Sequence, residues 1–246
     1  MSRPSMKSGK PGVGKPLTLE PLAMSVQLGA RAYRALWNGI VAGTIDSGVQ
    51  LRPDAVAQQL DISTTPVREA LYRLEADGVV VKLPYKGWYV REFTEQEVRD
   101  MYEMRAALEC FGVRLACERI TDEQIAWLRE NQAVGEAALA DADMEAYRLY
   151  NRDLHAAIVD AARNAYLTSV MAQVDLHSQV LVAKTIRLAG RPSRGIEEHR
   201  ELIELIARRD EHAAQDLMRV HILSASEDII RFAIGRPAQA LPAVAT

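Results

Sequence analysis

The sequence predicts a mostly α-helical protein with an N-terminal winged helix-turn-helix domain and a C-terminal all-α bundle of about six helices. The first observation is the order of local signals over residues 22–91: helix, helix, turn, capped helix and β-hairpin. The second is a change after Arg91, where strand signals give way to long amphipathic helices. A chain of 246 residues, 48% of them hydrophobic, is long enough for two ordinary domains.

Three helices open the N-terminal domain. Apolar residues recur at helical spacing over residues 22–43, and the glycine at the end stops the helix. After a loop, residues 53–60 form a short second helix with proline in its first turn. The third helix is predicted to have Thr65 as its N-cap, Pro66 at its first position and Gly78 at its end. Its apolar stripe consists of Val67, Ala70, Leu71 and Leu74.

A β-hairpin follows the third helix at once. Residues 79–83 and 88–90 are rich in β-branched and aromatic side chains, and residues 84–87 join them as a four-residue turn. This hairpin is the predicted wing, and the N-terminal domain ends with it at residue 91.

The C-terminal domain is predicted to cover residues 92–234 and to contain only helices. Thr94-x-x-Glu97 and Thr121-x-x-Gln124 are capping boxes that open helices of about 25 and 20 residues. The remaining four helices are expected near residues 144–162, 165–189, 196–208 and 211–234. Gly190-Arg191-Pro192 is interpreted as the break between the second and third of these four.

Charge is distributed unevenly along the chain. The net charge is +3 over residues 1–21, +2 over residues 22–91 and −8 over the remainder, which gives −3 in total. Residues 1–21 are rich in Gly, Ser, Pro and Lys and are expected to form a disordered basic arm, and the Ala/Pro-rich residues 235–246 a loose tail. A basic end on an acidic body suits a protein that binds DNA through one domain.

The sequence predicts neither export nor a membrane segment. No apolar run approaches the roughly 18 residues that span a bilayer, and the basic N-terminus lacks the apolar core of a signal peptide. Cys110 and Cys117 are expected to be two small core thiols, because a disulfide between these helix positions is geometrically unfavourable. We therefore expect a cytoplasmic protein.

The order of elements in the N-terminal domain is typical of a DNA-reading domain. A recognition helix presents its N-terminal residues to base edges and phosphates. Arg68 can donate two parallel hydrogen bonds to a guanine, or contact a phosphate. Thr64 and Thr65 can bind phosphate through hydroxyl or backbone N–H groups.

Three further positions extend this predicted surface. Lys86 and Gly87 at the wing tip suit close approach to a minor groove, since glycine allows contact and lysine supplies charge. Arg52, before the second helix, can reach the DNA backbone. The alternative is that these residues are solvated charges and that Thr65 is only a cap, but the order of elements over 70 residues favours DNA binding.

Two strings in the third helix carry a family resemblance. Thr-Pro-Val-Arg-Glu-Ala-Leu at residues 65–71, followed by Arg-Leu-Glu-Ala-Asp-Gly at residues 73–78, closely resembles the GntR family of bacterial transcription regulators. The helical region after it resembles the FadR-type branch, whose ligand-binding domain is called FCD, and the resemblance covers about residues 22–233. One departure is Thr64, where the family commonly has a DNA-contacting Arg. This difference implies an altered operator sequence or weaker binding.

Three of the five histidines lie in helices that could converge. Asn151 and His155 are four residues apart and share one helical face, whereas His199 is expected to open the fifth helix and His221 to lie midway along the sixth. Three imidazoles and one oxygen ligand are a common shell for a transition metal. From the residues alone, surface histidines or hydrogen-bonded core histidines are the commoner case.

The family resemblance implies a metal site. Asn151, His155, His199 and His221 match the family's metal ligands position by position, and the other two histidines match none. The family more often has Asp where this chain has Asn151, so the neutral amide oxygen leaves the site more positive. Imidazole ligands suit zinc and nickel, and the oxygen ligand also admits manganese.

The resemblance also implies a small carboxylate effector held by the metal, because an open coordination position on a cation favours anions. Arg105 aligns with a recurrent Arg of the first FCD helix, and it is expected to pair with the effector or with Glu109. Arg148, seven residues before His155 and so near the same face, is a second candidate for binding the effector.

Three functions are compatible with these sequence features. The leading one is a homodimeric regulator, commonly a repressor in the resembling family, whose two heads bind a near-palindromic double-stranded operator and are rearranged by the effector. In the second, the C-terminal domain binds an effector without metal, or only dimerises. The third is a metal-dependent enzyme, which we do not expect because no side chain is clearly placed as a general base.

Overall fold

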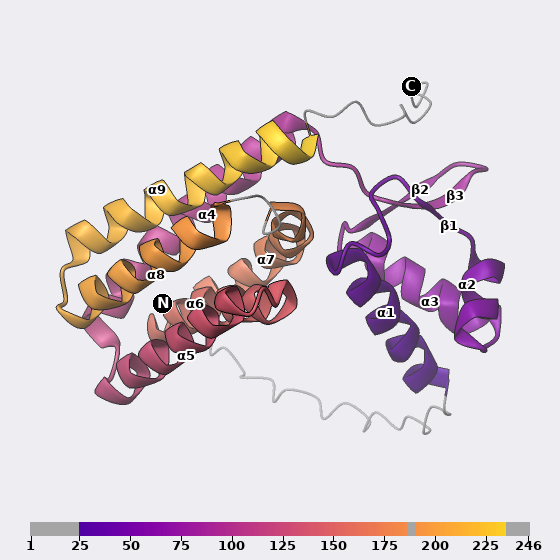
Figure 1. Ribbon diagram of the computed structural model, residues 1–246. Helices are drawn as coiled ribbons and strands as arrows, with labels where there is room; N and C mark the ends of the chain where they lie inside the picture. Colours follow the sequence, from indigo (N-terminus) through magenta and orange to yellow (C-terminus); the bar gives the residue numbers. More distant parts are fainter. Residues whose placement is uncertain (1–24, 186–189, 235–246) are drawn as a thin grey trace, which may run out of the picture.

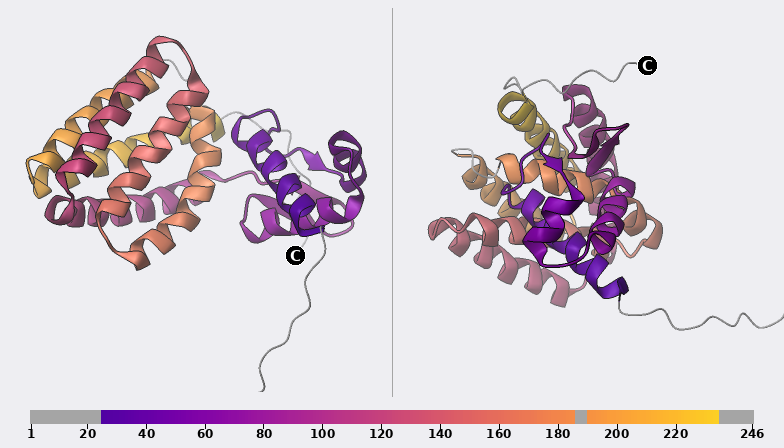
Figure 2. Two further views of the ribbon diagram at one scale, coloured as in Figure 1. Left: turned by 90° about the horizontal axis from the view of Figure 1, so that it is seen from below. Right: turned by 90° about the vertical axis from the view of Figure 1, so that its right-hand side faces the viewer.

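The computed structural model describes residues 25–185 and 190–234. The predicted arm over residues 1–21 and the predicted tail over residues 235–246 lie outside them. Figure 1 shows two lobes side by side: a smaller lobe of residues 25–91, called the head, and a larger lobe of residues 95–234, called the body. The left view of Figure 2 separates the same two lobes.

The head contains three helices, α1 (Ser25–Val41), α2 (Pro53–Leu60) and α3 (Thr64–Ala76). The predicted apolar stripe of α3 is fully buried, and α3 contacts both α1 and α2. The predicted N-cap is wrong, because the cap is Ser63 and α3 already begins at Thr64. Pro66 therefore lies within the first turn, where backbone N–H groups have no partner inside the helix and a proline is tolerated.

The wing is a three-stranded antiparallel sheet in the order β1-β3-β2. Its strands are β1 (Gln50–Leu51), β2 (Val80–Leu83) and β3 (Gly87–Val90). β2 and β3 are the predicted hairpin, whereas β1 falls in a predicted loop, because two residues carry no periodic signal of their own. Gly87 has a φ of +92°, a backbone conformation that favours glycine, and it closes the hairpin turn.

Six α-helices form the body within the described residues, as predicted. They are α4 (Glu95–Arg119), α5 (Asp122–Ala140), α6 (Met144–Ala161), α7 (Ala165–Thr185), α8 (Arg191–Ala207) and α9 (Glu211–Ile229), followed by the π-helical turn η1 (Ile230–Ile234). Both predicted capping boxes are present, at Thr94 and Thr121. The start of α8 was predicted wrongly: the helix begins at Arg191, because Pro192 lies in its first turn, where proline is compatible with a helix.

α4 lies at the centre of the body. It packs along α9 and also contacts α6, α7 and α8, and Figure 1 shows it behind α9. On the other side α5 packs against α6 and α8. Gly135 on α5 makes this approach possible, since a Cβ at that position would lie 2.5 Å from the ring of Tyr150 on α6. Among the described helices, none is both long enough and apolar enough to cross a membrane.

Both cysteines are free thiols, as predicted, with Cys117 buried and Cys110 half-buried. Burial raises the pKa of each thiol to about 11, so both are protonated at neutral pH. Cys110 donates a hydrogen bond to the backbone oxygen of Gln215, at 3.3 Å. The two thiols therefore serve the packing of α4 and do not form a reactive pair.

Candidate functional site

The predicted DNA-contacting side chains of α3 lie at its start. Arg68 and Thr65 are exposed, and Thr64 is half-buried in the first turn. Arg52 is exposed between β1 and α2, immediately before the proline that opens α2. These positions leave the two arginines accessible from outside the head.

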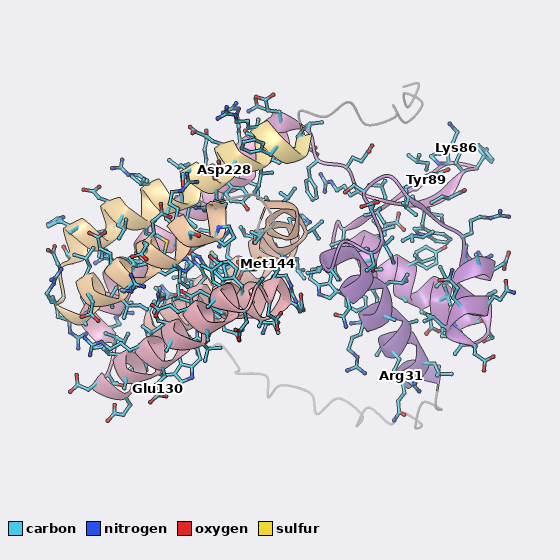
Figure 3. The ribbon with its side chains drawn as sticks, in the orientation of Figure 1. Arg31, Lys86, Tyr89, Glu130, Met144 and Asp228 are labelled. Atoms are coloured by element: carbon cyan, nitrogen blue, oxygen red, sulfur yellow. The ribbon has the colours of Figure 1, made fainter. Side chains whose placement is uncertain are left out.

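The wing tip carries the other two predicted residues. Lys86 is exposed and Gly87 is half-buried at the hairpin turn. Figure 3 shows Lys86 at the outer end of the wing, on the side of the head away from the body. The turn is held by Gln50, whose Nε2 donates to the backbone oxygen of Lys86 at 2.6 Å.

Aromatic contacts join α3 to the wing. The indole N–H of Trp88 donates to Glu75 at 3.1 Å, and the Tyr72 ring meets the Trp88 ring edge-on with centroids 5.2 Å apart. The ammonium group of Lys82 lies 4.7 Å from the centre of the Trp88 ring. α3 and the wing therefore form one continuous surface, and Lys82 is an exposed cation on it that the sequence did not single out.

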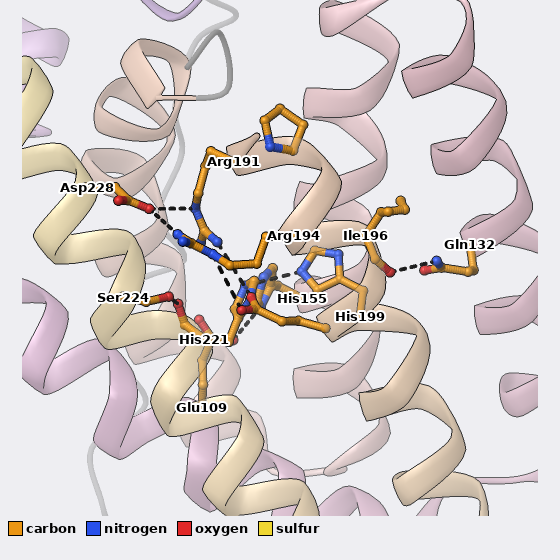
Figure 4. A network of polar contacts seen from close by, with 12 residues as sticks. Glu109, Gln132, His155, Arg191, Arg194, Ile196, His199, His221, Ser224 and Asp228 are labelled. Carbon is orange, nitrogen blue, oxygen red and sulfur yellow. Dashed lines mark hydrogen bonds and ion pairs between the residues drawn. The ribbon is translucent and has the colours of Figure 1, made fainter. Parts of the chain in front are cut away.

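The body brings the three predicted histidines together. His155 on α6, His199 on α8 and His221 on α9 are 4%, 0% and 4% exposed. One nitrogen of each lies within 4.8 Å of the others, and the Nε2 atoms of His199 and His221 are 3.2 Å apart. Figure 4 shows these imidazoles facing one another between their helices. His199 lies in the middle of α8, not at its start as predicted, because α8 begins earlier.

The opposite ring nitrogen of each histidine is held by a hydrogen bond. His155 Nδ1 lies 2.5 Å from Glu109 Oε2, and His221 Nδ1 lies 2.6 Å from Glu198 Oε2. Although burial on its own would raise the pKa of Glu109, Arg105 and His155 hold it at about 2. The pKa of Glu198 is also lowered, against the effect of burial, chiefly by its bond to His221. Because ionised carboxylates only accept hydrogen bonds, both Nδ1 atoms are donors.

The Nδ1 atom of His199 is also a hydrogen-bond donor, and its acceptor is a tyrosine oxygen. The Tyr150 hydroxyl donates to Gln132 Oε1 at 2.6 Å, so its oxygen is an acceptor toward His199 Nδ1 at 2.9 Å. The orientation of the Gln132 amide is fixed, since its nitrogen donates to the backbone oxygen of Ile196 at 3.0 Å. In neutral imidazoles protonated at Nδ1, each Nε2 presents a lone pair. One ring nitrogen of each of the three histidines therefore faces the same buried point.

Protonation of His199 and His221 is unfavourable at neutral pH. Burial, reinforced by the neighbouring positive groups, lowers the pKa of His199 well below its ordinary value. Burial also lowers the pKa of His221 to about 4, although its bond to Glu198 opposes this. At neutral pH both rings are uncharged, which is the form that binds metals. Carboxylates that hold the distal nitrogen of metal-binding histidines are a common arrangement around such ions.

Asn151, the fourth predicted ligand, lines the same cavity as His155 and His221. It lies one turn before His155 on α6 and is half-buried. The cavity has a volume of about 30 Å³. An amide oxygen beside three imidazole nitrogens is a donor set that fits a first-row transition metal.

The structure separates the two predicted effector-binding arginines. Arg105 lines the cavity, and its Nε donates to Glu109 Oε1 at 2.5 Å, so the predicted pair with Glu109 is present and binding of an effector by Arg105 stays a prediction. Arg148 pairs with Glu145 through two hydrogen bonds of 2.8 and 2.6 Å and does not line the cavity. The geometry therefore keeps Arg105 as a candidate and gives no support to Arg148.

Several residues of the site were missed from the sequence. Tyr150 and Glu198 orient the histidines, and Arg191 lines the cavity. Glu198 stands directly before His199, a signal that was available. The sequence does not point to Arg191, because Gly190-Arg191-Pro192 suits a break between helices as well as the start of one.

A winged head with an exposed recognition helix, joined to a helical body, defines a DNA-binding transcription regulator. Two family models match the chain: residues 28–90 match "Bacterial regulatory proteins, gntR family" and residues 100–224 match the FCD domain. The chain therefore belongs to the GntR family, in the branch that carries an FCD domain, and the resemblance found in the sequence is confirmed.

Curated relatives agree with this assignment. The chain is 30% identical over 192 residues to the Nta operon transcriptional regulator of Aminobacter aminovorans, covering 76% of this chain and 88% of that protein. It is 28% identical over 200 residues to the HTH-type transcriptional repressor GlaR of Escherichia coli (strain K12), covering 78% and 91%. These relatives are regulators, which confirms the expectation that the chain is not an enzyme.

A solved structure supports the fold. E. coli McbR/YncC matches with a TM-score of 0.72 at 22% identity, covering 83% of this chain and 97% of that one. At this identity the likeness shows the fold alone, and it confirms the predicted combination of winged head and helical body.

Proposed function

We propose that this regulator binds a near-palindromic operator as a homodimer, represses transcription in the cytoplasm, and changes its operator affinity when a small carboxylate effector binds at a metal in the body. Residues 22–91 would read the DNA, and residues 92–234 would bind the effector and dimerise. The observation that carries the metal part is the convergence of three buried imidazole nitrogens, within 4.8 Å of one another.

His155, His199, His221 and Asn151 would hold the ion, which we expect to be zinc, nickel or manganese. When bound, the ion supplies an open Lewis-acidic position that favours an anion. Arg105 supports the same preference from the cavity wall. The cavity is small, with a volume of about 30 Å³, so we expect an effector of several carbon atoms to displace wall residues.

α7 is the route that we propose from the cavity to the head. Val182 on α7 lines the cavity, and Asp175 lies close enough to Arg105 for their charges to interact. His177, on the same helix, donates from Nε2 to the backbone oxygen of Asp77, the C-cap of α3, at 2.9 Å. An effector that displaces the cavity wall would therefore move a helix that contacts the end of the recognition helix.

The proposed operator contacts are those of the head surface. They are Arg52, Thr64, Thr65, Arg68, Lys86 and Gly87. The dimer contact is proposed on α4 and α7, where the large apolar side chains Met104, Phe111, Tyr166 and Val170 are exposed. A two-fold dimer suits two half-sites about one helical turn apart.

A metal-free body is the alternative. Asn151 favours it, because a neutral amide is a weaker metal ligand than the carboxylate more common in the family. An effector affinity that is unchanged by chelation and in His199→Ala would support a metal-free sensor. If no effector binds at all, the body would only dimerise.

Footprinting upstream of the protein's own gene tests the proposal. The full-length protein is expected to protect two half-sites at low salt, and acetate, malonate or succinate is expected to alter this protection for the zinc-loaded protein but not after chelation. Absence of protection contradicts the DNA part. Protection that responds to neither metal nor any of the acids contradicts the effector part.

A further inference from the structure

Two buried side-chain polar atoms within residues 25–185 and 190–234 have no hydrogen-bond partner, the Nη1 atom of Arg191 and the hydroxyl of Tyr102. Both lie near Arg105. Arg191 and Arg105 line the histidine cavity together, and the Arg105 guanidinium lies 5.6 Å from the centre of the Tyr102 ring. A buried donor without a hydrogen-bond partner is energetically unfavourable. A bound ligand that supplies the missing acceptor would explain why such a donor is present.

The carboxylates that contact Arg191 leave part of the hydrogen-bonding capacity of its guanidinium unused. Its Nε lies 3.4 Å from Asp228 and its Nη1 lies 3.5 Å from Glu198, longer than the about 2.7–2.9 Å of a charge-assisted hydrogen bond. Both carboxylates have closer partners: Asp228 pairs with Arg194, and Glu198 with His221 at 2.6 Å. Figure 4 shows Arg191 reaching toward the histidines from the first turn of α8.

We propose that Arg191 is the residue that selects the effector, by donating from Nη1 to a carboxylate that sits in the cavity beside His155 and His221. This inference rests on the proposed function and deepens it. A guanidinium is always charged and presents its donors in a fixed plane, so Arg191 favours a small carboxylic acid over its neutral amide or alcohol. Arg105 is less free for this task, because its Nε is already bonded to Glu109.

Cobalt(II) provides a readout of the site itself, because its visible spectrum changes when a ligand coordinates. The full-length protein, Arg191→Gln and Arg194→Gln would be loaded with cobalt and titrated separately with acetate, malonate and succinate. Arg194 is the matched control: it pairs with the same two carboxylates, is 48% exposed and does not line the cavity. Cobalt stoichiometry is expected to be equal in all three proteins.

Arg191→Gln is expected to weaken binding of the tightest-binding of the three acids about 10- to 100-fold, because a hydrogen bond between charged groups is lost. Arg194→Gln should change the affinity for the same acid less than about 3-fold. Equal affinity in Arg191→Gln and the unaltered protein overturns the inference. So does an equal loss in both variants, because the effect would then act through Asp228 and Glu198. Arg191→Lys, which keeps the charge but not the planar donors, replaces Arg191→Gln if that variant fails to fold.

Failure of the metal site is a separate result. If the unaltered protein takes up no cobalt, the proposed metal function is contradicted. The proposal for Arg191 is then tested by the Tm of thermal unfolding of the metal-free proteins, measured with and without each of the same three acids. A rise of Tm with acid that disappears in Arg191→Gln but persists in Arg194→Gln supports the inference. No response of the unaltered protein to any of the three acids overturns it.

Discussion

The head and the body carry their candidate functional residues in opposite environments. In the head, Arg52, Arg68 and Lys86 are exposed, within reach of a large polyanion outside the protein. In the body, His155, His199 and His221 are buried, and each donates a hydrogen bond to a side chain of a neighbouring helix. The head is arranged to bind a large partner at its surface, and the body to enclose a small ligand.

This difference has an energetic consequence. Exposed cations in the head cost little to keep, and their binding to DNA depends on salt because they displace counterions. Buried imidazoles in the body are unfavourable unless their lone pairs are satisfied, so the site depends on its ligand and on its supporting hydrogen bonds. Changes in the two lobes should therefore have separable effects, and only the contact between the lobes should link them.

Arg68→Ala is expected to give the largest effect and to confine it to the head. Loss of a base-reading arginine should reduce operator affinity about 10- to 100-fold, while binding to unrelated DNA falls much less. Fluorescence anisotropy with both DNAs measures this. Arg31→Ala, which removes an exposed arginine of α1, is the matched control. Equal losses for Arg68→Ala on both DNAs would show that Arg68 contacts only phosphate.

Gly135→Ala is expected to disturb the body alone. A Cβ there meets the Tyr150 ring at 2.5 Å, and Tyr150 cannot yield freely because it is bonded to Gln132 and His199. We expect the free energy of unfolding to fall by about 1–3 kcal/mol, measured by urea denaturation, with weaker metal binding and unchanged operator affinity. Gly112→Ala, whose nearest atom is a flexible leucine carbon at 3.3 Å, should cost far less. Equal stabilities of the two variants would contradict this account of the packing.

His177→Ala tests the link between the lobes. It removes the hydrogen bond to Asp77 and a ring contact with Phe93, whose centroid is 5.5 Å away. Metal content and acid binding should stay unchanged, while the difference in operator affinity with and without acid shrinks by about 1 kcal/mol or more. His212→Ala, a change at an 89% exposed histidine, is the control. Undiminished coupling in His177→Ala would rule out the α7 route.

Lys86→Ala is expected to give the smallest effect. A lysine that contacts a phosphate contributes charge without sequence information, so all DNAs should bind slightly less well. The slope of log affinity against log salt should fall by about one, measured from 50 to 200 mM salt. A slope that does not change would place the wing tip away from the DNA.

Local patterns were sufficient for most of the fold. The apolar stripe of α3 and the two capping boxes are signals within single helices, and the structure confirms them. β1 was missed because two residues cannot show a period, and the start of α8 was missed because Pro192 suits both a break and a first turn. These errors concern boundaries and not the kind of element.

The site was predictable only in part, for a different reason. The three histidines were found through a family resemblance, and helical spacing alone did not distinguish them from core residues. The groups that orient them, Glu109 and Tyr150, lie 46 and 49 residues from the rings that they hold. Contacts across such distances depend on how the helices pack, so Arg191 and its unpartnered donor could be recognised only in three dimensions.

Elemental analysis is the most direct test of the central claim that the body holds a metal. The protein would be purified without a histidine tag, beside His155→Ala/His199→Ala and His212→Ala. About one transition metal per chain is expected in the unaltered protein and in His212→Ala, and none in the double variant. No metal in any of the three, even after soaking with zinc, nickel and manganese, would contradict the account and leave a metal-free sensor or a dimerisation domain.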